Sequence, residues 1–335
     1  QIQRMKEDIQ KHGDDPHFKE MIEEELKWQE ERFKREYPDF TEEWLNKKDV
    51  KITSVDFSQA KNLISIGDYA FVRNELQTLN LSDLPNLTNI KECAFLSNQI
   101  QSVELTNLPE LKEIGYSSFE SNKVQKLSLT NLPKMTHIKH NAFRYNKIQS
   151  LDLSNLPSLT IIDTQAFSDN EIQFLKLSNL PELKEIGYES FQDNQIQSLD
   201  LKDLPNLTTI GRQAFEDNLI KTLNLSNLPQ LNTIKYAAFN RNQIQSLVIK
   251  DFPKLTEIKP DAFEKNQIQS LQLSNLPELA TIGYSAFGKN QIQKFTVSNV
   301  PRDCVLESKY DYSVFTGNPH PNDYYEQIIR NNPQE

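Results

Sequence analysis

The side chains that could carry out chemistry are few in this sequence, and their spacing does not assemble a catalytic site. Of the five histidines, only His137 and His140 are close together, and a metal ion on this pair would need further ligands from the same or adjacent segments. Two unrelated surface substitutions are the simpler explanation. No Ser or Cys is placed with a base and an orienting acid, and the glycines occur singly rather than in a phosphate-binding loop. We therefore expect no enzyme, no cofactor and no metal.

Any functional residue must be positioned by a 24-residue repeat that dominates the chain. A register without insertion or deletion indicates one supersecondary unit stacked on itself. The hydrophobic fraction of 37% and the mean hydropathy of -0.64 suit a stack in which each coil buries a narrow apolar interior. We predict an α/β solenoid of about ten coils. The repeat is marked by the phenylalanines Phe71, Phe95, Phe119, Phe143, Phe167, Phe191, Phe215, Phe239, Phe263 and Phe287.

The copy over residues 148–171 shows how the first half of each coil is built. Leu151 and Leu153 alternate with polar residues, which is typical of a short strand with one buried face. An Asn-Leu-Pro motif at residues 155–157 then closes the strand, because proline lacks an amide donor and the Asn side chain bonds nearby backbone. These strands are expected to pair side by side into one long parallel sheet.

The second half of the same copy adds another apolar pair and a phenylalanine turn. Leu159 and Ile162 form the pair, and Phe167 follows with Asn170 three residues after it. The segment around Phe167 predicts one tight helical or 3₁₀ turn on the back of the coil. A buried Asn in such a stack can hydrogen-bond the backbone of the adjacent coil.

The sequence divides into three parts. Residues 1–50 form a helical N-terminal segment without the repeat, residues 51–299 form the solenoid, and residues 300–335 form an irregular C-terminal cap. The last part loses the pattern but keeps enough apolar surface to cover the final coil, through Tyr310, Tyr312, Phe315, Tyr324, Tyr325, Ile328 and Ile329.

The N-terminal segment contains an amphipathic helix. Asp15-Pro16 is a helix start, and Phe18, Ile22 and Leu26 follow at helical spacing. We interpret this helix as a lid, because the first coil would otherwise expose an apolar flank and an open strand edge. A partner-binding arm is the alternative.

The two cysteines of such a stack cannot form a disulfide within one molecule. Cys93 and Cys304 lie nearly nine coils apart, which is roughly 40 Å at about 4.8 Å per coil, and a disulfide requires Cα atoms within about 7 Å. Cys93 occupies a place where other copies have Tyr, Ser, Asn or Gln. We therefore expect Cys93 at a tolerant outer position, and we interpret both residues as unpaired thiols without a role.

The composition excludes two classes of partner. The net charge of -10 argues against nucleic acid or an anionic membrane, because phosphate binding needs clustered Lys and Arg. No apolar run approaches the roughly 20 residues of a membrane span, so no membrane insertion is expected. The chain begins at Gln1 without a visible signal peptide, which indicates a processed or truncated fragment.

The repeat combines a Leu-x-x-Leu-x-Leu strand with an Ile-Gly-x-x-Ala-Phe segment, as at residues 282–287, and with Ser in place of Ala at residues 186–191. Over residues 52–299 it resembles the leucine-rich repeat superfamily, and within it the BspA-like repeats of bacterial surface proteins. There is one departure: Leu156 stands where the family has Asn or Cys, with Asn one place earlier. The series that includes Asn146 is the candidate to replace the family's asparagine ladder. The resemblance implies a secreted, cell-surface bacterial protein that binds host or microbial macromolecules.

Candidate binding residues are those that break the pattern on the outer side of the strands. Because Leu151 and Leu153 point inward, Ser150, Asp152 and Ser154 are expected to point outward. The corresponding residues of other copies are mostly Ser, Thr, Asn and Gln. An exposed aromatic residue ringed by charges suits a binding hot spot, with neutral drift on a tolerant surface as the alternative. The candidate ligand-binding residues are Asp152, Phe174, Lys176, Asp200, Lys202, Val248 and Lys250.

Two functional hypotheses follow from different classes. The first is an adhesion module that engages a protein, or less readily a glycan, through its strand face. The second is a structural stalk that presents ligand-binding domains located elsewhere in a longer protein. An enzyme ranks last.

Overall fold

The computed structural model describes residues 51–154, 156–308, 313–319 and 328. The chain divides into two compact units, Gln1–Lys51 and Ile52–Glu335. The predicted N-terminal helix lies outside the described residues, as do five residues proposed to cover the last coil, Tyr310, Tyr312, Tyr324, Tyr325 and Ile329. The helical cap and the three-part division remain predictions.

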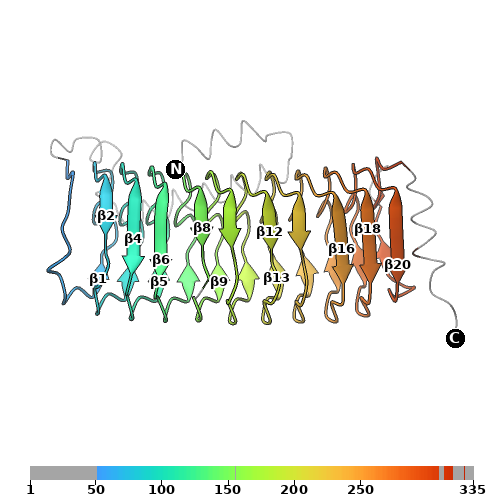
Figure 1. Cartoon of the computed structure of the whole chain (residues 1–335), viewed down its shortest axis with the longest axis horizontal. Coiled ribbons are helices and arrows are strands. Elements are labelled where there is room, and N and C mark those ends of the chain that lie inside the picture. Colours follow the sequence, from blue (N-terminus) through green and yellow to red (C-terminus); the bar gives the residue numbers. More distant parts are fainter. Residues whose placement is uncertain (1–50, 155, 309–312, 320–327, 329–335) are drawn as a thin grey trace, which may run out of the picture. The chain divides into compact units, whose positions relative to one another are not determined.

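The second unit is a solenoid in which each coil after the first contributes two short strands, and every described strand pair is parallel (Figure 1). The Leu-x-Leu segments form the even-numbered strands, which stand side by side on one face. We call the outer side of these strands the strand face. They are β2 (Thr78–Asn80), β4 (Ser102–Thr106), β6 (Lys126–Thr130), β8 (Ser150–Asp152), β10 (Phe174–Lys176), β12 (Ser198–Asp200), β14 (Thr222–Asn224), β16 (Ser246–Lys250), β18 (Ser270–Ser274) and β20 (Lys294–Ser298).

The prediction of one long sheet of Leu-x-Leu strands was wrong. These strands divide into three sheets, and the continuous sheet is an eleven-stranded ladder of two-residue strands from the second half of each coil. Such strands are too short for a period-two pattern, so their pairing was invisible in the sequence. They are β1 (Ser65–Ile66), β3 (Asn89–Ile90), β5 (Glu113–Ile114), β7 (His137–Ile138), β9 (Ile161–Ile162), β11 (Glu185–Ile186), β13 (Thr209–Ile210), β15 (Thr233–Ile234), β17 (Glu257–Ile258), β19 (Thr281–Ile282) and β21 (Val305–Leu306).

The fold is a β-solenoid of about ten turns rather than the predicted α/β array, because the segment around each Phe is a turn and not a helix. Gln165 and Asp169 both have left-handed φ angles, of 53° and 55°, and a residue in that region ends a helical turn. The amide of Phe167 donates to the carbonyl of Ser190 in the next coil at 2.9 Å. Backbone groups that would build a helix therefore join neighbouring coils.

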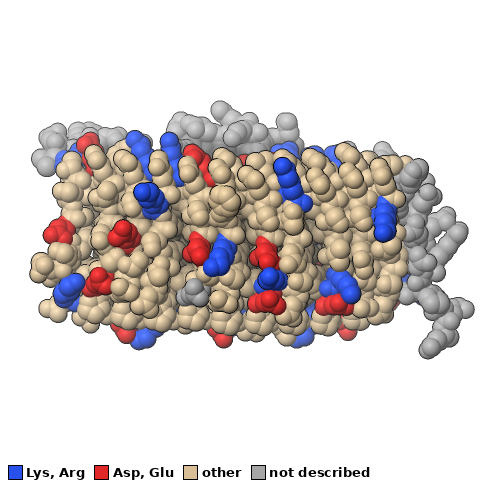
Figure 2. Space-filling view, in the orientation of Figure 1, with Lys and Arg blue, Asp and Glu red and all other residues tan. Residues whose placement is uncertain are grey.

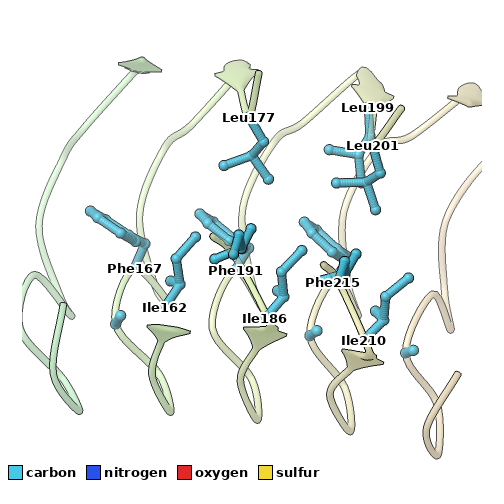
Figure 3. Close-up of a cluster of buried hydrophobic side chains, with 14 of the residues drawn as sticks. Ile162, Phe167, Leu177, Ile186, Phe191, Leu199, Leu201, Ile210 and Phe215 are labelled. Atoms are coloured by element: carbon cyan, nitrogen blue, oxygen red, sulfur yellow. The ribbon is translucent and has the colours of Figure 1, made fainter. Parts of the chain in front are cut away.

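The core consists of identical residues stacked coil on coil, as predicted. Leu153, Ile162 and Phe167 have no exposed surface. Neighbouring phenylalanine rings lie parallel, with centroids 5.3 Å apart for Phe143 and Phe167 and 5.5 Å apart for Phe167 and Phe191. Figure 3 shows Phe167, Phe191 and Phe215 repeating this position in successive coils.

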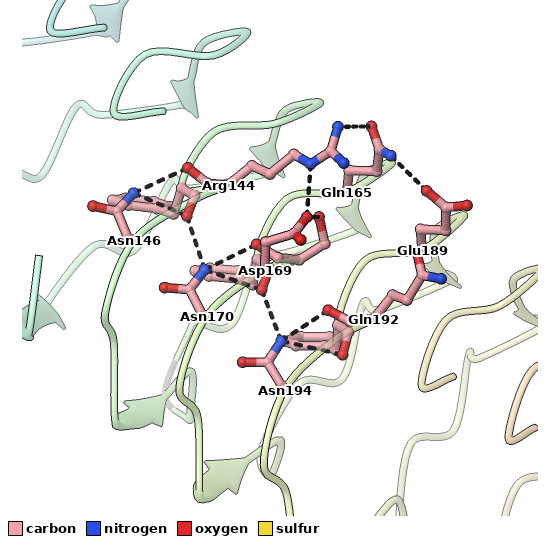
Figure 4. A network of polar contacts seen from close by, with 12 residues as sticks. Arg144, Asn146, Gln165, Asp169, Asn170, Glu189, Gln192 and Asn194 are labelled. Carbon is pink, nitrogen blue, oxygen red and sulfur yellow. Dashed lines mark hydrogen bonds and ion pairs between the residues drawn. The ribbon is translucent and has the colours of Figure 1, made fainter. Parts of the chain in front are cut away.

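A buried asparagine ladder runs beside the phenylalanines and confirms the role suggested for the Asn146 series. Nδ2 of Asn170 donates to the carbonyls of Phe143 and Phe167, at 3.0 and 3.1 Å. Its Oδ1 accepts the amide of Ile148 at 3.1 Å. The same contacts recur at Asn146 and Asn194 (Figure 4). Each Asn thus joins two coils through donors and acceptors that would otherwise be buried without partners.

The C-terminal segment continues the stack instead of merely covering it. Phe315 is fully buried, and its ring lies 5.8 Å from that of Phe287. Asn318 extends the asparagine ladder by donating to the carbonyl of Phe287 at 2.8 Å. Ile328, at 4% exposure, also packs into the core as predicted.

Candidate interaction surface

The strand face carries few charges, and several of them lie beside a residue of opposite sign (Figure 2). This follows from the period-two pattern, which buries the two leucines and leaves mostly Ser, Thr, Asn and Gln outside. One expectation for this face was wrong. Ser154 is only 6% exposed, because the chain turns inward where its amide donates to Oδ1 of Asp152 at 2.8 Å.

Phe174 projects from the middle of this face. It lies on β10, in register with Ser150 on β8 and Ser198 on β12. Its exposed fraction of 70% is the highest among the large hydrophobic residues that the structure describes. The predicted position is therefore confirmed, and an apolar ring stands between two small polar neighbours.

The four charged candidates lie to one side of this ring. Asp152, Lys176 and Asp200 are the last residues of β8, β10 and β12, two residues beyond the row of Phe174, and Lys202 follows β12. Lys176 Nζ lies 3.2 Å from Oδ2 of Asp152, and Lys202 Nζ lies 3.3 Å from Oδ2 of Asp200. Slight burial acts to raise the pKa of Asp152, but hydrogen bonds from Ser154 and Lys176 outweigh it, so this pKa is lowered. The structure thus groups five candidates into one surface, the Phe174 patch, formed by Asp152, Phe174, Lys176, Asp200 and Lys202.

Val248 and Lys250 do not belong to this patch. They lie on β16, which belongs to a different sheet from β10. Val248 is 46% exposed and stands three coils from Lys176, which is about 14 Å along the stack. Lys250 pairs with Asp251 at 3.5 Å.

The histidine pair does not assemble a metal site. Nδ1 of His137 contacts Oγ1 of Thr136 at 3.0 Å, while the ring of His140 lies 6.3 Å from that of Tyr116. Burial and the nearby Lys139 lower the pKa of His137. Among the residues that the structure describes, no group of three His, Cys, Asp or Glu side chains could hold a metal ion. Within the same ranges, no helix has the length and apolarity needed to cross a bilayer.

The chain matches the family described as BspA type Leucine rich repeat region, with six copies over residues 46–173 and 184–302. The matched residues are well over half of the sequence. The chain belongs to the BspA-type leucine-rich repeat family. A search of curated proteins found no match.

Two solved structures resemble this BspA-type array. The functional domain of InlJ from Listeria monocytogenes, described as including a cysteine ladder, has a TM-score of 0.47 and 20% identity, covering 77% of this chain and 48% of that one. The pneumococcal vaccine antigen PcpA has a TM-score of 0.38 and 18% identity, covering 79% of this chain and 75% of that one. The chain spans about half the length of the InlJ domain.

The BspA-type coils also contain a buried polar network that the sequence did not reveal. Cys93 belongs to the column that builds it, and at 6% exposure it is not the outer residue we expected. In later coils the same position holds Gln165 and Glu189, which are also buried. Residue types vary between copies at this position, and such variation in the sequence is also typical of an exposed position that tolerates substitution. Its residues instead fill the space behind the phenylalanine turns.

Arg144 anchors one end of this network (Figure 4). Its Nε lies 3.0 Å from Oδ2 of Asp169, and its Nη1 donates to Oε1 of Gln165 at 3.1 Å. Gln165 in turn donates to Glu189. Burial raises the pKa of Glu189, against the opposing effects of Tyr188, Arg144 and Gln165.

Glu216 forms a second buried acid one coil further. Its Oε2 accepts hydrogen bonds from Gln213 and, at 3.1 Å, from Gln192. Burial, with Asp217 and Glu189 nearby, raises the pKa of Glu216 to about 8. This carboxyl therefore keeps its proton over much of the neutral range.

Proposed function

We propose that this BspA-type array is a bacterial cell-surface module that binds a protein through the Phe174 patch on its strand face. The observation that carries the proposal is the 70% exposure of Phe174 on a strand held between two neighbours. An aromatic ring presented on rigid backbone offers contact area with little loss of conformational entropy on binding.

The charges around the ring support a protein partner. Lys176–Asp152 and Lys202–Asp200 present both signs beside an apolar centre, which suits a surface of mixed charge. A nucleic acid would require a basic surface, and the chain has a net charge of -10. A glycan is less well matched, because Phe174 is the one exposed aromatic residue on the described strands of this face; Phe295 on β20 is buried.

The surface location rests on the family. BspA-like repeats are found in surface proteins of bacteria, and an elongated stack displays one face along its whole length. The alternative is a stalk, supported by the plain polar surface that surrounds the patch.

Binding of the whole chain to a panel of immobilised extracellular matrix proteins, measured by surface plasmon resonance, tests the proposal. For any protein captured, the double variant Phe174→Ala, Lys176→Glu should weaken binding by about tenfold or more. The matched control is Val248→Ala, Lys250→Glu, which truncates an exposed apolar residue and reverses a lysine two residues later on β16, and it should leave binding unchanged. If both variants bind like the parent, the Phe174 patch is not the site. If nothing is captured by this chain but a longer form captures a ligand, the stalk is correct.

A further inference from the structure

The charges on the turns that follow the phenylalanines are arranged differently from those on the strand face. The second residue after each Phe points outward from a left-handed conformation, with φ between 50° and 55° in six successive coils. The amide of each donates to the coil beyond, as in Asp193 to Glu216 and Asp217 to Asn240, both at 3.2 Å. Neighbours in this series are therefore one coil apart. We call the series the charge column: Asp169, Asp193, Asp217, Arg241, Lys265 and Lys289.

The charge column is sorted by sign, with three acids followed by three bases. Like charges on adjacent strands or coils repel, so this order is less favourable within one chain than an alternating order. Contacts inside the chain compensate in part. Asp217 lies 3.5 Å from Arg241 at the boundary, Asp169 pairs with Arg144 at 3.0 Å, and Lys289 reaches the buried Glu264 at 2.8 Å.

Part of each charged side chain stays exposed despite these contacts. The exposed fractions are 28% for Asp169 and Asp217, 46% for Arg241, 39% for Lys265 and 45% for Lys289. The acidic half and the basic half are thus both available to a second molecule along one edge of the solenoid.

We propose that the partner of this edge is a second copy of the same chain, docked antiparallel about a two-fold axis between Asp217 and Arg241. Such an axis places the acidic half of each copy against the basic half of the other. Asp217 then faces Arg241, Asp193 faces Lys265, and Asp169 faces Lys289. The match is self-complementary, as a two-fold interface requires. The proposal does not depend on the function assigned to the strand face.

An exposed apolar residue lies at the centre of the proposed interface. Leu219 follows Asp217 by two residues and is 38% exposed, whereas the same place in the other full copies holds Gln, Glu or Lys. The two Leu219 side chains of the dimer lie one coil apart along the stack, on either side of the two-fold axis. A small apolar centre with a charged rim is the usual plan of a protein interface.

The dimensions predict a weak dimer that depends on salt. Six coils extend about 25 Å, and a single edge of that length buries less than a standard interface. Charge pairs at such a rim mainly set orientation and are screened by salt. Association is therefore expected at low ionic strength and high local concentration.

Sedimentation velocity tests the proposal on the whole chain at about 100 μM, in about 20 mM and about 0.5 M NaCl. The parent should dimerise at low salt and dissociate at high salt. The acid-reversed variant (Asp169→Lys, Asp193→Lys, Asp217→Lys) and the base-reversed variant (Arg241→Glu, Lys265→Glu, Lys289→Glu) should each be monomeric. An equimolar mixture of the two should form a heterodimer, because each supplies the sign that the other lacks.

Formation of the heterodimer would also show that both reversed variants are folded, so their monomeric state when alone could not be explained by loss of structure. The net-charge control is Glu104→Lys, Glu182→Lys, Glu278→Lys, which changes the total charge as much as the acid-reversed variant and should leave the dimer intact. Leu219→Gln should weaken self-association by about tenfold. A parent that stays monomeric at low salt, or reversed variants that dimerise as well as the parent, would overturn the proposal.

Discussion

Stacked charges are ordered in opposite ways on the strand face and on the edge formed by the turns after each Phe, which carries the charge column and which we call the turn edge. On the strand face, Asp152, Lys176 and Asp200 occupy equivalent places in successive coils, and their signs alternate. On the turn edge, the charge column holds three acids and then three bases. In an alternating column each charge lies beside an opposite charge, whereas most neighbours in a sorted column have the same sign and, in our proposal, meet opposite charges on a second copy. The order of the charge signs along a column therefore says as much about the expected partner of a surface as the charges themselves do.

The two regions also differ in how deeply their charged and polar side chains are buried. The strand face is one layer of exposed side chains over a leucine core, so its charged pairs remain in water. Behind the turn edge lies a second polar layer, in which Arg144, Glu189 and Glu216 are buried. Substitutions should accordingly be mild on the strand face and costly behind the turns.

The largest effect is expected from two phenylalanines that differ only in burial. Phe167→Ala removes a fully buried ring that stacks on both neighbouring coils, and it should lower the free energy of unfolding by about 3–5 kcal/mol. Phe174→Ala removes a ring that is 70% exposed and should cost less than about 0.5 kcal/mol. Urea denaturation of both variants measures the difference. A melting temperature of Phe167→Ala within about 1 °C of the parent would contradict the buried stack.

The second-largest effect concerns the pH dependence of the free energy of unfolding, through the buried carboxyl of Glu216. The pKa of Glu216 is raised from 4.5 to about 8 in the folded protein, so the native state holds this proton more tightly than the unfolded chain. The stabilisation is complete below pH 4.5 and is lost as the pH rises through about 8. Between pH 5 and pH 9 the parent should lose on the order of 2 kcal/mol through this group, allowing for relaxation around the ionised carboxylate.

The control for this prediction is Glu216→Gln, which keeps the hydrogen-bonding shape without the ionisation. The difference in stability between parent and variant should grow in favour of the variant as the pH rises. Parallel stability curves for the two proteins from pH 5 to pH 9 would show that Glu216 is not the group responsible.

The sequence predicted the core of the fold well because every coil repeats the same apolar residues. Leu153, Ile162, Phe167 and Asn170 recur at a fixed interval, and identical residues at a fixed interval must stack. The exposed position of Phe174 was predictable for the same reason, since period two places it opposite the buried leucines.

Other features could not be predicted from one copy of the repeat. The left-handed residues at Gln165 and Asp169 are neither glycine nor part of a turn signature, so the tight turn resembled a helical one. The column of Cys93 and Glu189 varies like a surface but is buried, because its side chains bond one another across coils. A position whose residue type varies between copies is therefore one where identical residues need not stack, but its side chains can still be buried.

The smallest expected effect compares two ion pairs of similar length. Lys176–Asp152 and Arg144–Asp169 have N–O distances of 3.2 and 3.0 Å, but the side chains are 58% and 57% exposed in the first pair and 9% and 28% in the second. Double-mutant cycles to Ala should give a coupling of about 0.2–1 kcal/mol for the strand-face pair, because water screens it and ordering two long side chains offsets the attraction. Removing Asp169 should cost more than removing Asp152, since the guanidinium of Arg144 would lose a charge partner in a buried site. Equal costs for the two removals would mean that the layer behind the turns is as well solvated as the strand face, and the contrast in depth between the two regions would fail.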